Sequence, residues 1–127
     1  MQTFGHVVTK PIALHHILGV AESEPLDSIT IDGLTFFEAC AKGHANIAVT
    51  FLLGGFPVNN NELEGQGYTA LHYAASSGNA MLVKVLIDNG AAVDSASTQN
   101  SYTPLMLALS TGKLEVAQQL IIAGADP

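Results

Sequence analysis

Small, apolar and polar residues recur along this chain at a nearly constant interval. Residues 32–43, 67–78 and 101–112 each end in a glycine, and these three glycines lie 35 and 34 residues apart. The segment after each glycine carries apolar residues at positions i, i+1, i+4 and i+5, which form one stripe of an amphipathic helix. A second glycine follows twelve residues after the first in every unit. The pattern therefore predicts at least three copies of one structural unit.

Each unit is predicted to contain two helices joined by a turn. The apolar columns of the second helix are Ile47, Leu82 and Val116; Ala48, Val83 and Ala117; Phe51, Leu86 and Leu120; and Leu52, Ile87 and Ile121. The first helix is shorter and has a packing column of mostly small residues, which lets a neighbouring helix approach closely. Its members are Ala39 and Cys40, Ala74 and Ala75, and Ala108 and Leu109. Between units, the polar stretches 59–67 and 94–101 predict turns or extended hairpins.

The middle unit resembles the ankyrin repeat. Residues 69–78 read TALHYAASSG, which follows the family pattern T-P-L-H-x-A-A-x-x-G except that Ala70 replaces the proline. The third unit keeps Thr, Pro and Leu at residues 103–105, but Met106 replaces the histidine and Leu109 replaces the second alanine. The resemblance implies an all-α ankyrin-repeat solenoid of stacked helix-turn-helix units joined by hairpin loops.

The first unit can be aligned with this pattern in two ways. Either Leu34 takes the threonine column and Phe37 the histidine column, or Thr35 is the threonine and the first helix is one residue shorter. The residues by themselves leave both alignments open.

The resemblance also implies boundaries for the repeats. Complete repeats are expected at residues 32–66 and 67–100, and a third at 101–127 is cut at the next hairpin. Residues 1–31 are expected to form a degenerate repeat that caps the N-terminal end of the stack, because terminal repeats are usually atypical. Within them, the apolar stretch 12–21 leaves a cleaved secretory signal as the alternative.

Composition narrows the choice of partner. The 127 residues include four lysines, no arginine and eleven acidic residues, for a net charge of −7. Neutralising phosphates takes clustered lysine and arginine, so this balance argues against nucleic acid and anionic membranes. We therefore expect a partner protein with a neutral or basic, partly apolar surface. Cys40 is the single cysteine, which excludes an internal disulfide and fits a cytoplasmic protein.

No catalytic or metal site is expected, and no cofactor. His15 and His16 are adjacent, so on a helix their side chains diverge by about 100° and do not readily ligate one ion. The resemblance gives His72 structural hydrogen bonds across the turn between repeats, and it gives His44 a structural role at a helix end. Cys40 falls in the packing column, where a buried thiol is inert. The chain is therefore expected to catalyse no reaction.

Partner binding is expected, by resemblance, on the concave face formed by the hairpin tips and the exposed side of each first helix. The expected contact residues are Gln66, Tyr68, Tyr73, Ser76 and Ser77 in the middle unit, Gln99, Asn100, Tyr102, Leu107, Ser110 and Thr111 in the third, and Glu38, Ala41 and Lys42 in the first. All three tyrosines fall in this set, and tyrosine is enriched at protein interfaces. Alternatively, Tyr68 and Tyr102 stack on each other between adjacent hairpins. Leu63, in the longer loop, is either a further contact or part of a tolerated insertion.

Two functions fit these features. The first is a non-catalytic protein-protein interaction module. The alternative is the targeting or substrate-recognition domain of a larger enzyme, channel or bacterial effector. In both cases Leu120, Ile121 and Ile122 would end the stack without a polar capping repeat, which leaves apolar surface for a partner domain or a second copy to cover.

Overall fold

The computed structural model describes residues 26–63 and 65–126. In this part of the chain a short 3₁₀ turn, η1 (Leu26–Ser28), is followed by three pairs of α-helices. The pairs are α2 (Phe36–Lys42) and α3 (Ala45–Leu53), α4 (Ala70–Ser77) and α5 (Ala80–Asp88), and α6 (Pro104–Ser110) and α7 (Leu114–Ile122). Most of the predicted capping repeat, with His15, His16 and the signal-like stretch 12–21, lies outside the described residues.

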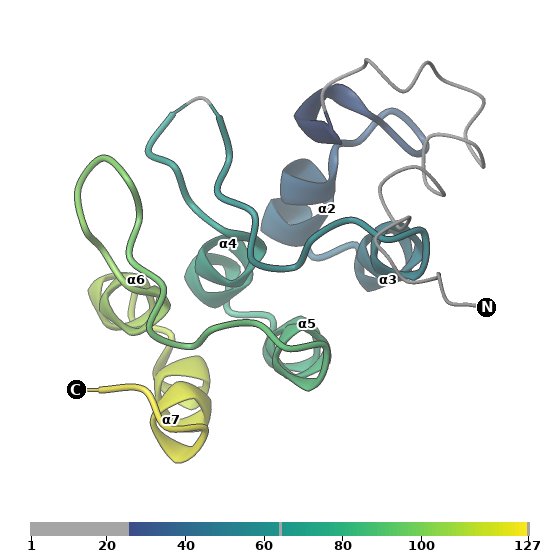
Figure 1. Ribbon diagram of the computed structural model, residues 1–127. Coiled ribbons are helices and arrows are strands. Elements are labelled where there is room, and N and C mark those ends of the chain that lie inside the picture. The colour runs from purple at the N-terminus through teal and green to yellow at the C-terminus, as the bar shows by residue number, and fades with distance from the viewer. Residues whose placement is uncertain (1–25, 64, 127) are drawn as a thin grey trace, which may run out of the picture.

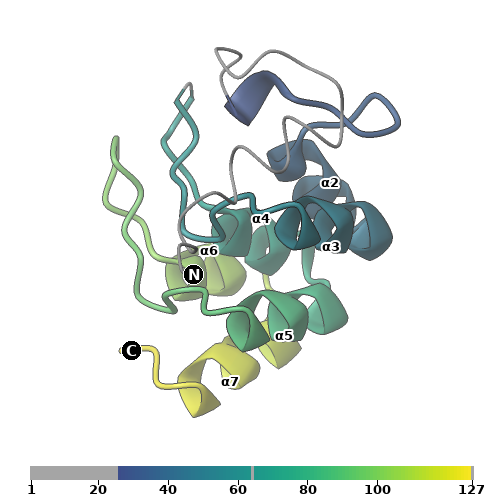
Figure 2. The ribbon, with the colours of Figure 1, turned by 45° about the vertical axis from the view of Figure 1, so that its right-hand side comes forward.

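The helices form two layers. α2, α4 and α6 pack side by side in one layer, and α3, α5 and α7 form the second (Figure 1). The connections that lead into α4 and α6 leave the helices as hairpin loops, and both loops project in the same direction beyond the first layer (Figure 2). The described part of the chain is thus the all-α stack that the repeat pattern predicts.

A threonine begins the first helix of every unit. Thr35, Thr69 and Thr103 are N-caps, and each side-chain oxygen accepts a hydrogen bond from the backbone N–H three residues later. In the first unit, the Glu38 carboxylate accepts a hydrogen bond from the backbone N–H of Thr35, which completes a capping box. Thr35 is therefore the threonine of this unit and Glu38 takes the histidine column. The alignment through Leu34 is excluded, because a leucine side chain has no oxygen that could cap the helix.

The residue types that fill the core differ from one unit of the stack to the next. In the first unit the rings of Phe36 and Phe51 pack on Phe56, with centroid separations of 4.5 and 5.7 Å. Leucines take over in the later units, where five of them are almost fully buried: Leu71, Leu82, Leu86, Leu105 and Leu120. Two predicted columns of the second helices are buried in all three units, namely Ala48, Val83 and Ala117, and Phe51, Leu86 and Leu120. Their burial confirms the helical register.

Two leucines of α6 occupy sides opposite to those predicted. Leu109, assigned to the packing column, is 54% exposed, whereas Leu107, assigned to the binding face, is only 9% exposed. Leu109 continues the column of Cys40 and Ala75, which are fully buried inside the stack, but no further described repeat covers α6. Leu107 stands where α4 has Tyr73, whose ring packs back on the preceding unit. A leucine at that position has no polar end that reaches the surface.

Candidate functional site

One surface of the molecule is formed by the hairpin loops together with the exposed sides of α2, α4 and α6, and we call it the open face. On it lies a groove of about 580 Å³, which we call the α2 groove. Its lining residues are Asp27, Ser28, Thr35, Phe37, Glu38, Ala41, Glu62, Leu63 and Tyr73. Leu63 is 78% exposed. The groove thus joins the hairpin before α4 to the first helices of two successive units.

Glu62 holds the hairpin side of the α2 groove in place. Its backbone N–H donates to the carbonyl of Tyr68 at 2.9 Å, and its Oε2 accepts the backbone N–H of Tyr68 at 3.1 Å. The Tyr73 hydroxyl donates to the same carboxylate, 2.7 Å from Oε1 and 2.8 Å from Oε2. Burial raises the pKa of Tyr73 above its ordinary value, and the hydrogen bond to Glu62 and its negative charge raise the pKa further. Tyr73 therefore stays neutral and acts as a donor.

Two further carboxylates line the groove. Asp27 accepts the side-chain amide of Asn60 at 2.9 Å and the backbone N–H of Leu63 at 2.8 Å. Glu38 accepts the backbone N–H of Thr35 at 3.0 Å. These donors are all neutral, and within the described residues the only ion pair is that of Lys84 with Asp88 on α5. The α2 groove is consequently acidic, and no cation among residues 26–63 and 65–126 forms an ion pair with its carboxylates.

His72 makes the structural hydrogen bonds that the resemblance implies. Its Nδ1 accepts the backbone N–H of Thr69 at 3.0 Å, and its Nε2 lies 2.7 Å from the carbonyl of Tyr102 in the next hairpin. The imidazole must therefore carry its proton on Nε2 and be neutral. Burial lowers its pKa, against the smaller opposing effect of the Tyr102 carbonyl. His44 differs: it is exposed and its side chain forms no capping hydrogen bond.

The three tyrosines have different surroundings. Tyr68 stacks on His72 with ring centroids 5.1 Å apart, and it meets Tyr73 edge-on at 5.5 Å. The alternative partner, Tyr102, is not among its ring contacts in the described structure. Tyr102 as a residue is 46% exposed, and its backbone makes its hydrogen bonds to Ser97 and His72. Of the three, Tyr102 therefore has the ring most available to a partner.

The predicted hairpin-tip residues bond to one another. The Asn100 side-chain amide donates to Gln66 Oε1 at 3.1 Å, and the backbone N–H of Gln99 donates to the carbonyl of Gln66 at 3.1 Å. All three side chains remain exposed. These contacts join the two hairpins into one ridge beside the open face.

The remaining predicted contacts lie along the helices of the open face. The hydroxyls of Ser77, Ser110 and Thr111 donate to carbonyls of their own helices, at 2.9, 3.1 and 2.7 Å. Ser76 is half-buried, and the exposed residues of this group are Glu38, Ala41, Lys42, Ser77, Ser110 and Thr111. Leu107 is the one predicted contact that the structure buries.

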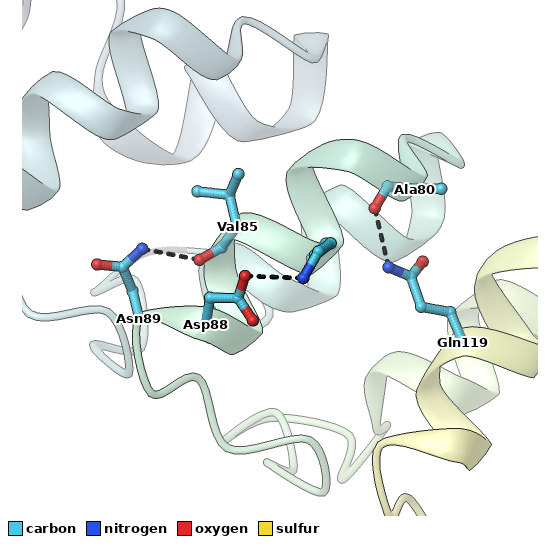
Figure 3. Close-up of polar contacts among 6 residues, drawn as sticks. Ala80, Val85, Asp88, Asn89 and Gln119 are labelled. Carbon is cyan, nitrogen blue, oxygen red and sulfur yellow. Dashed lines mark hydrogen bonds and ion pairs between the residues drawn. The ribbon is translucent and has the colours of Figure 1, made fainter.

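The second layer of helices, α3, α5 and α7, which we call the outer layer, carries none of the predicted contacts. Gln119 of α7 reaches toward α5, where its Nε2 donates to the carbonyl of Ala80 at 2.9 Å (Figure 3). The same view shows Asn89 bonded to the carbonyl of Val85 at 2.8 Å. The Gln119 bond connects α7 to α5, and the Asn89 bond lies at the C-terminal end of α5. Because this layer carries no predicted contacts, it is a suitable control surface for binding experiments.

The described residues give little support for a reactive thiol, a metal site or a membrane-spanning helix. Burial raises the pKa of the Cys40 thiol to about 12, so the thiolate is not available as a nucleophile. No group of three or more His, Cys, Asp or Glu side chains in residues 26–63 and 65–126 is placed to hold a metal ion. None of the described helices has the length and apolar character needed to span a membrane.

Several groove residues were not identified from sequence. Asp27 and Glu62 appear in the sequence only as acidic loop residues, and Phe37 belongs to the helix whose alignment was open. A threonine followed three residues later by glutamate, at Thr35 and Glu38, is the one local signal that places this helix. The meeting of Glu62 with Tyr73, eleven residues apart, has no such signal.

The fold and the open face define a class of protein: a short solenoid of helix-turn-helix repeats with projecting hairpins. Residues 36–127 match the family model described as ankyrin repeats in three copies. The chain therefore belongs to the ankyrin-repeat family, whose repeats are typical protein-interaction modules and are generally non-catalytic.

Similar curated proteins are much longer than this chain. It is 33% identical over 115 residues to glycerophosphocholine phosphodiesterase gde1 of Schizosaccharomyces pombe, covering 90% of this chain and 10% of that protein. It is 49% identical over 62 residues to a transient receptor potential cation channel subfamily A member 1 homologue of Caenorhabditis elegans, covering 47% and 5%. Alpha-latrotoxin-Lh1a of Latrodectus hasselti is 40% identical over 95 residues, covering 70% and 7%. The chain spans a tenth or less of each of these relatives.

Proposed function

We propose that this chain binds a partner protein on its open face and catalyses no reaction itself. The observation that supports this function is the α2 groove, which combines apolar walls with acidic groups between a hairpin and two helices. An interaction surface needs this mixture, because apolar contact provides affinity and charge provides selection. The exposed residues predicted from sequence would extend the contact from the groove toward Tyr102 and the end of α6.

Site-specific photocrosslinking tests which face binds. A p-benzoylphenylalanine at Tyr102 replaces an exposed ring whose residue uses its backbone for hydrogen bonds, so the fold is expected to persist. The same probe at exposed Gln118, on the outer layer, is the matched control. In an extract of the source cells, we expect discrete crosslinked proteins from Tyr102 and few from Gln118. Equal products from both positions would contradict binding on the open face.

A second candidate function is that of a recognition domain within a longer protein. The long relatives favour it, and so does an apolar end face formed by Met106, Leu109 and Ile121, which are 50%, 54% and 46% exposed. At Gly78, the Lys113 side chain of the next unit lies 2.7 Å from where a Cβ would stand, whereas nothing lies within 4 Å of the equivalent position at Gly112. At Gly112 the end face therefore lacks the inter-repeat contact that Lys113 makes at Gly78. We propose that a neighbouring domain or a second copy covers it.

A further inference from the structure

The α2 groove has apolar walls that are fixed in place. Phe37 is buried beneath it, with its ring centroid 6.2 Å from that of Tyr73. Leu63 is 78% exposed, yet its backbone N–H is held by Asp27 at 2.8 Å. Leu63 thus adds an exposed apolar side chain to the hairpin side of the groove. Ala41 continues the wall along α2. A groove of about 580 Å³ is also of the size that accommodates small ligands and side chains.

The carboxylates of the groove differ in how much hydrogen-bonding capacity they have left. Glu62 accepts the hydroxyl of Tyr73 on both oxygens and a backbone N–H on Oε2. Asp27 accepts one donor on each oxygen. Glu38 is exposed and accepts only the N–H of Thr35, on Oε1. Since a carboxylate offers about four lone-pair sites, Glu38 has the most capacity for an incoming donor.

Charge and shape together indicate what the groove accepts. An anion would meet three carboxylates, and the described residues contain no cluster suited to a metal ion. A lysine or arginine side chain matches both properties, because its aliphatic stem covers apolar surface while its cationic end stays at a polar rim. Lys42, one turn along α2 from Glu38, forms no ion pair in the described structure and so does not occupy this role.

We propose that the α2 groove binds an extended segment of the partner protein through a lysine or arginine side chain next to an apolar residue. The cation pairs with Glu38 and reaches toward Glu62, and the apolar neighbour packs on Leu63. This inference rests on the proposed function, since it names the chemistry of the partner segment at one part of the open face.

The test uses a defined probe, a nine-residue peptide that alternates leucine and lysine. A matched peptide has glutamine in place of every lysine. In ¹H–¹⁵N correlation spectra of the folded chain, we expect the lysine peptide to shift the amides of Phe37, Ala41 and Leu63. The glutamine peptide should bind about two- to fivefold more weakly, because the partly exposed ion pair between the lysine and Glu38 is lost.

Glu38→Gln isolates the charge from the fold. Glutamine at the third helical position keeps the capping box, so helix α2 is expected to form as before. The substitution should weaken binding of the lysine peptide about two- to fivefold. Glu115→Gln on α7 changes the net charge equally and should leave binding unchanged.

Three outcomes would overturn the proposal: amide shifts that fall outside the groove, equal affinity for the two peptides, or equal effects of Glu38→Gln and Glu115→Gln. The photocrosslinking at Tyr102 is independent of the groove charge. Loss of peptide selectivity with retained crosslinking would therefore refute the lysine or arginine preference while leaving the open face as the binding surface. Loss of face-selective crosslinking would contradict the proposed function itself.

Discussion

Single residues of the open face serve the fold and the surface at once. Tyr73 lies in a column that suggests partner contact, yet its ring packs on Phe37 and its hydroxyl is bonded to Glu62. Truncation to alanine would remove both contacts and destabilise the chain, so Tyr73→Ala cannot separate binding from folding. His72 similarly supports Tyr68 by stacking and holds the next hairpin through the Tyr102 carbonyl. The roles of these side chains follow from their partners rather than from their residue types.

The burial of His72 predicts a pH dependence of stability. Its folded-state pKa lies below the ordinary 6.5, so below pH 6.5 the unfolded chain takes up a proton that the folded chain does not. The free energy of unfolding should therefore fall as the pH drops from 6.5 toward the lower folded-state pKa, by at most about 1.4 kcal/mol per pH unit from this group.

Urea unfolding at several pH values measures this slope. His72→Gln serves as the comparison, because glutamine at the third helical position can also complete a capping box and does not titrate. We expect a shallower decline for the variant between pH 6.5 and 5. Identical slopes for the two chains would show that His72 does not contribute.

At the scale of elements, the hairpins are tied to one another as well as to the helices. The backbone N–H of Thr98 donates to the carbonyl of Gly67 at 3.4 Å, and Gln99 is bonded to Gln66. Gly67 has a φ of +73°, and a Cβ there would lie 1.7 Å from Thr98 Oγ1 and 3.0 Å from Thr98 N. The second hairpin can approach the first this closely only because residue 67 is glycine.

Gly67→Ala tests this close approach. The left-handed backbone alone costs an alanine about 1–2 kcal/mol, and the clash with Thr98 should add about 1–3 kcal/mol to the loss of unfolding free energy. Gly112→Ala is the matched control, because its φ is +74° and nothing lies within 4 Å of its Cβ position. Chemical denaturation of both variants gives the difference. Equal losses of unfolding free energy in the two variants would mean that the two hairpins can move apart without a cost in stability.

At the scale of the whole molecule, each unit is stable mainly through its neighbours. Helices of the first layer pack on one another from unit to unit, and Asn59 bonds to Gly90 and Ala92 of the following unit at 3.1 and 2.7 Å. Asp94 repeats this contact with the backbone N–H of Asp126 at 2.9 Å. In such a stack an end unit buries less surface than an internal one. The exposed leucine of α6 is the result of this arrangement.

The end face predicts self-association of the isolated chain. Light scattering during size-exclusion chromatography should show an average mass that rises with protein concentration. Leu109→Glu places a charge in the end face and should restore the monomer, whereas Ile122→Glu, at a residue that is 84% exposed on the outer layer, should not. A monomer at every concentration would contradict pairing of copies and leave a neighbouring domain as the occupant of this face.

Most of the fold could be predicted because its signals are local and repeated. Thr69 to Gly78 matches the family pattern closely, and the apolar columns around Leu86 predict which side of each second helix is buried. The site was predictable only in part. Exposed positions such as Ser110 follow from the helical period, but Leu107 and Leu109 exchange their expected environments, because burial depends on which unit lies next to the helix.

The sequence alone determined the number of described repeats, the approximate positions of their helices and most of the threonines and glycines that bound them, since capping and helical period depend on residues a few positions apart. The threonine of the first unit, Thr35, was decided by the hydrogen bonds of the folded helix. Only the tertiary structure decided which carboxylates meet. Asp27, Glu38 and Glu62 belong to separate loops and a helix, and they line one groove because the hairpin folds back beside α2. Three of the eleven acidic side chains of the chain thus gather in one groove. Their meeting depends on contacts between units that no local sequence pattern records.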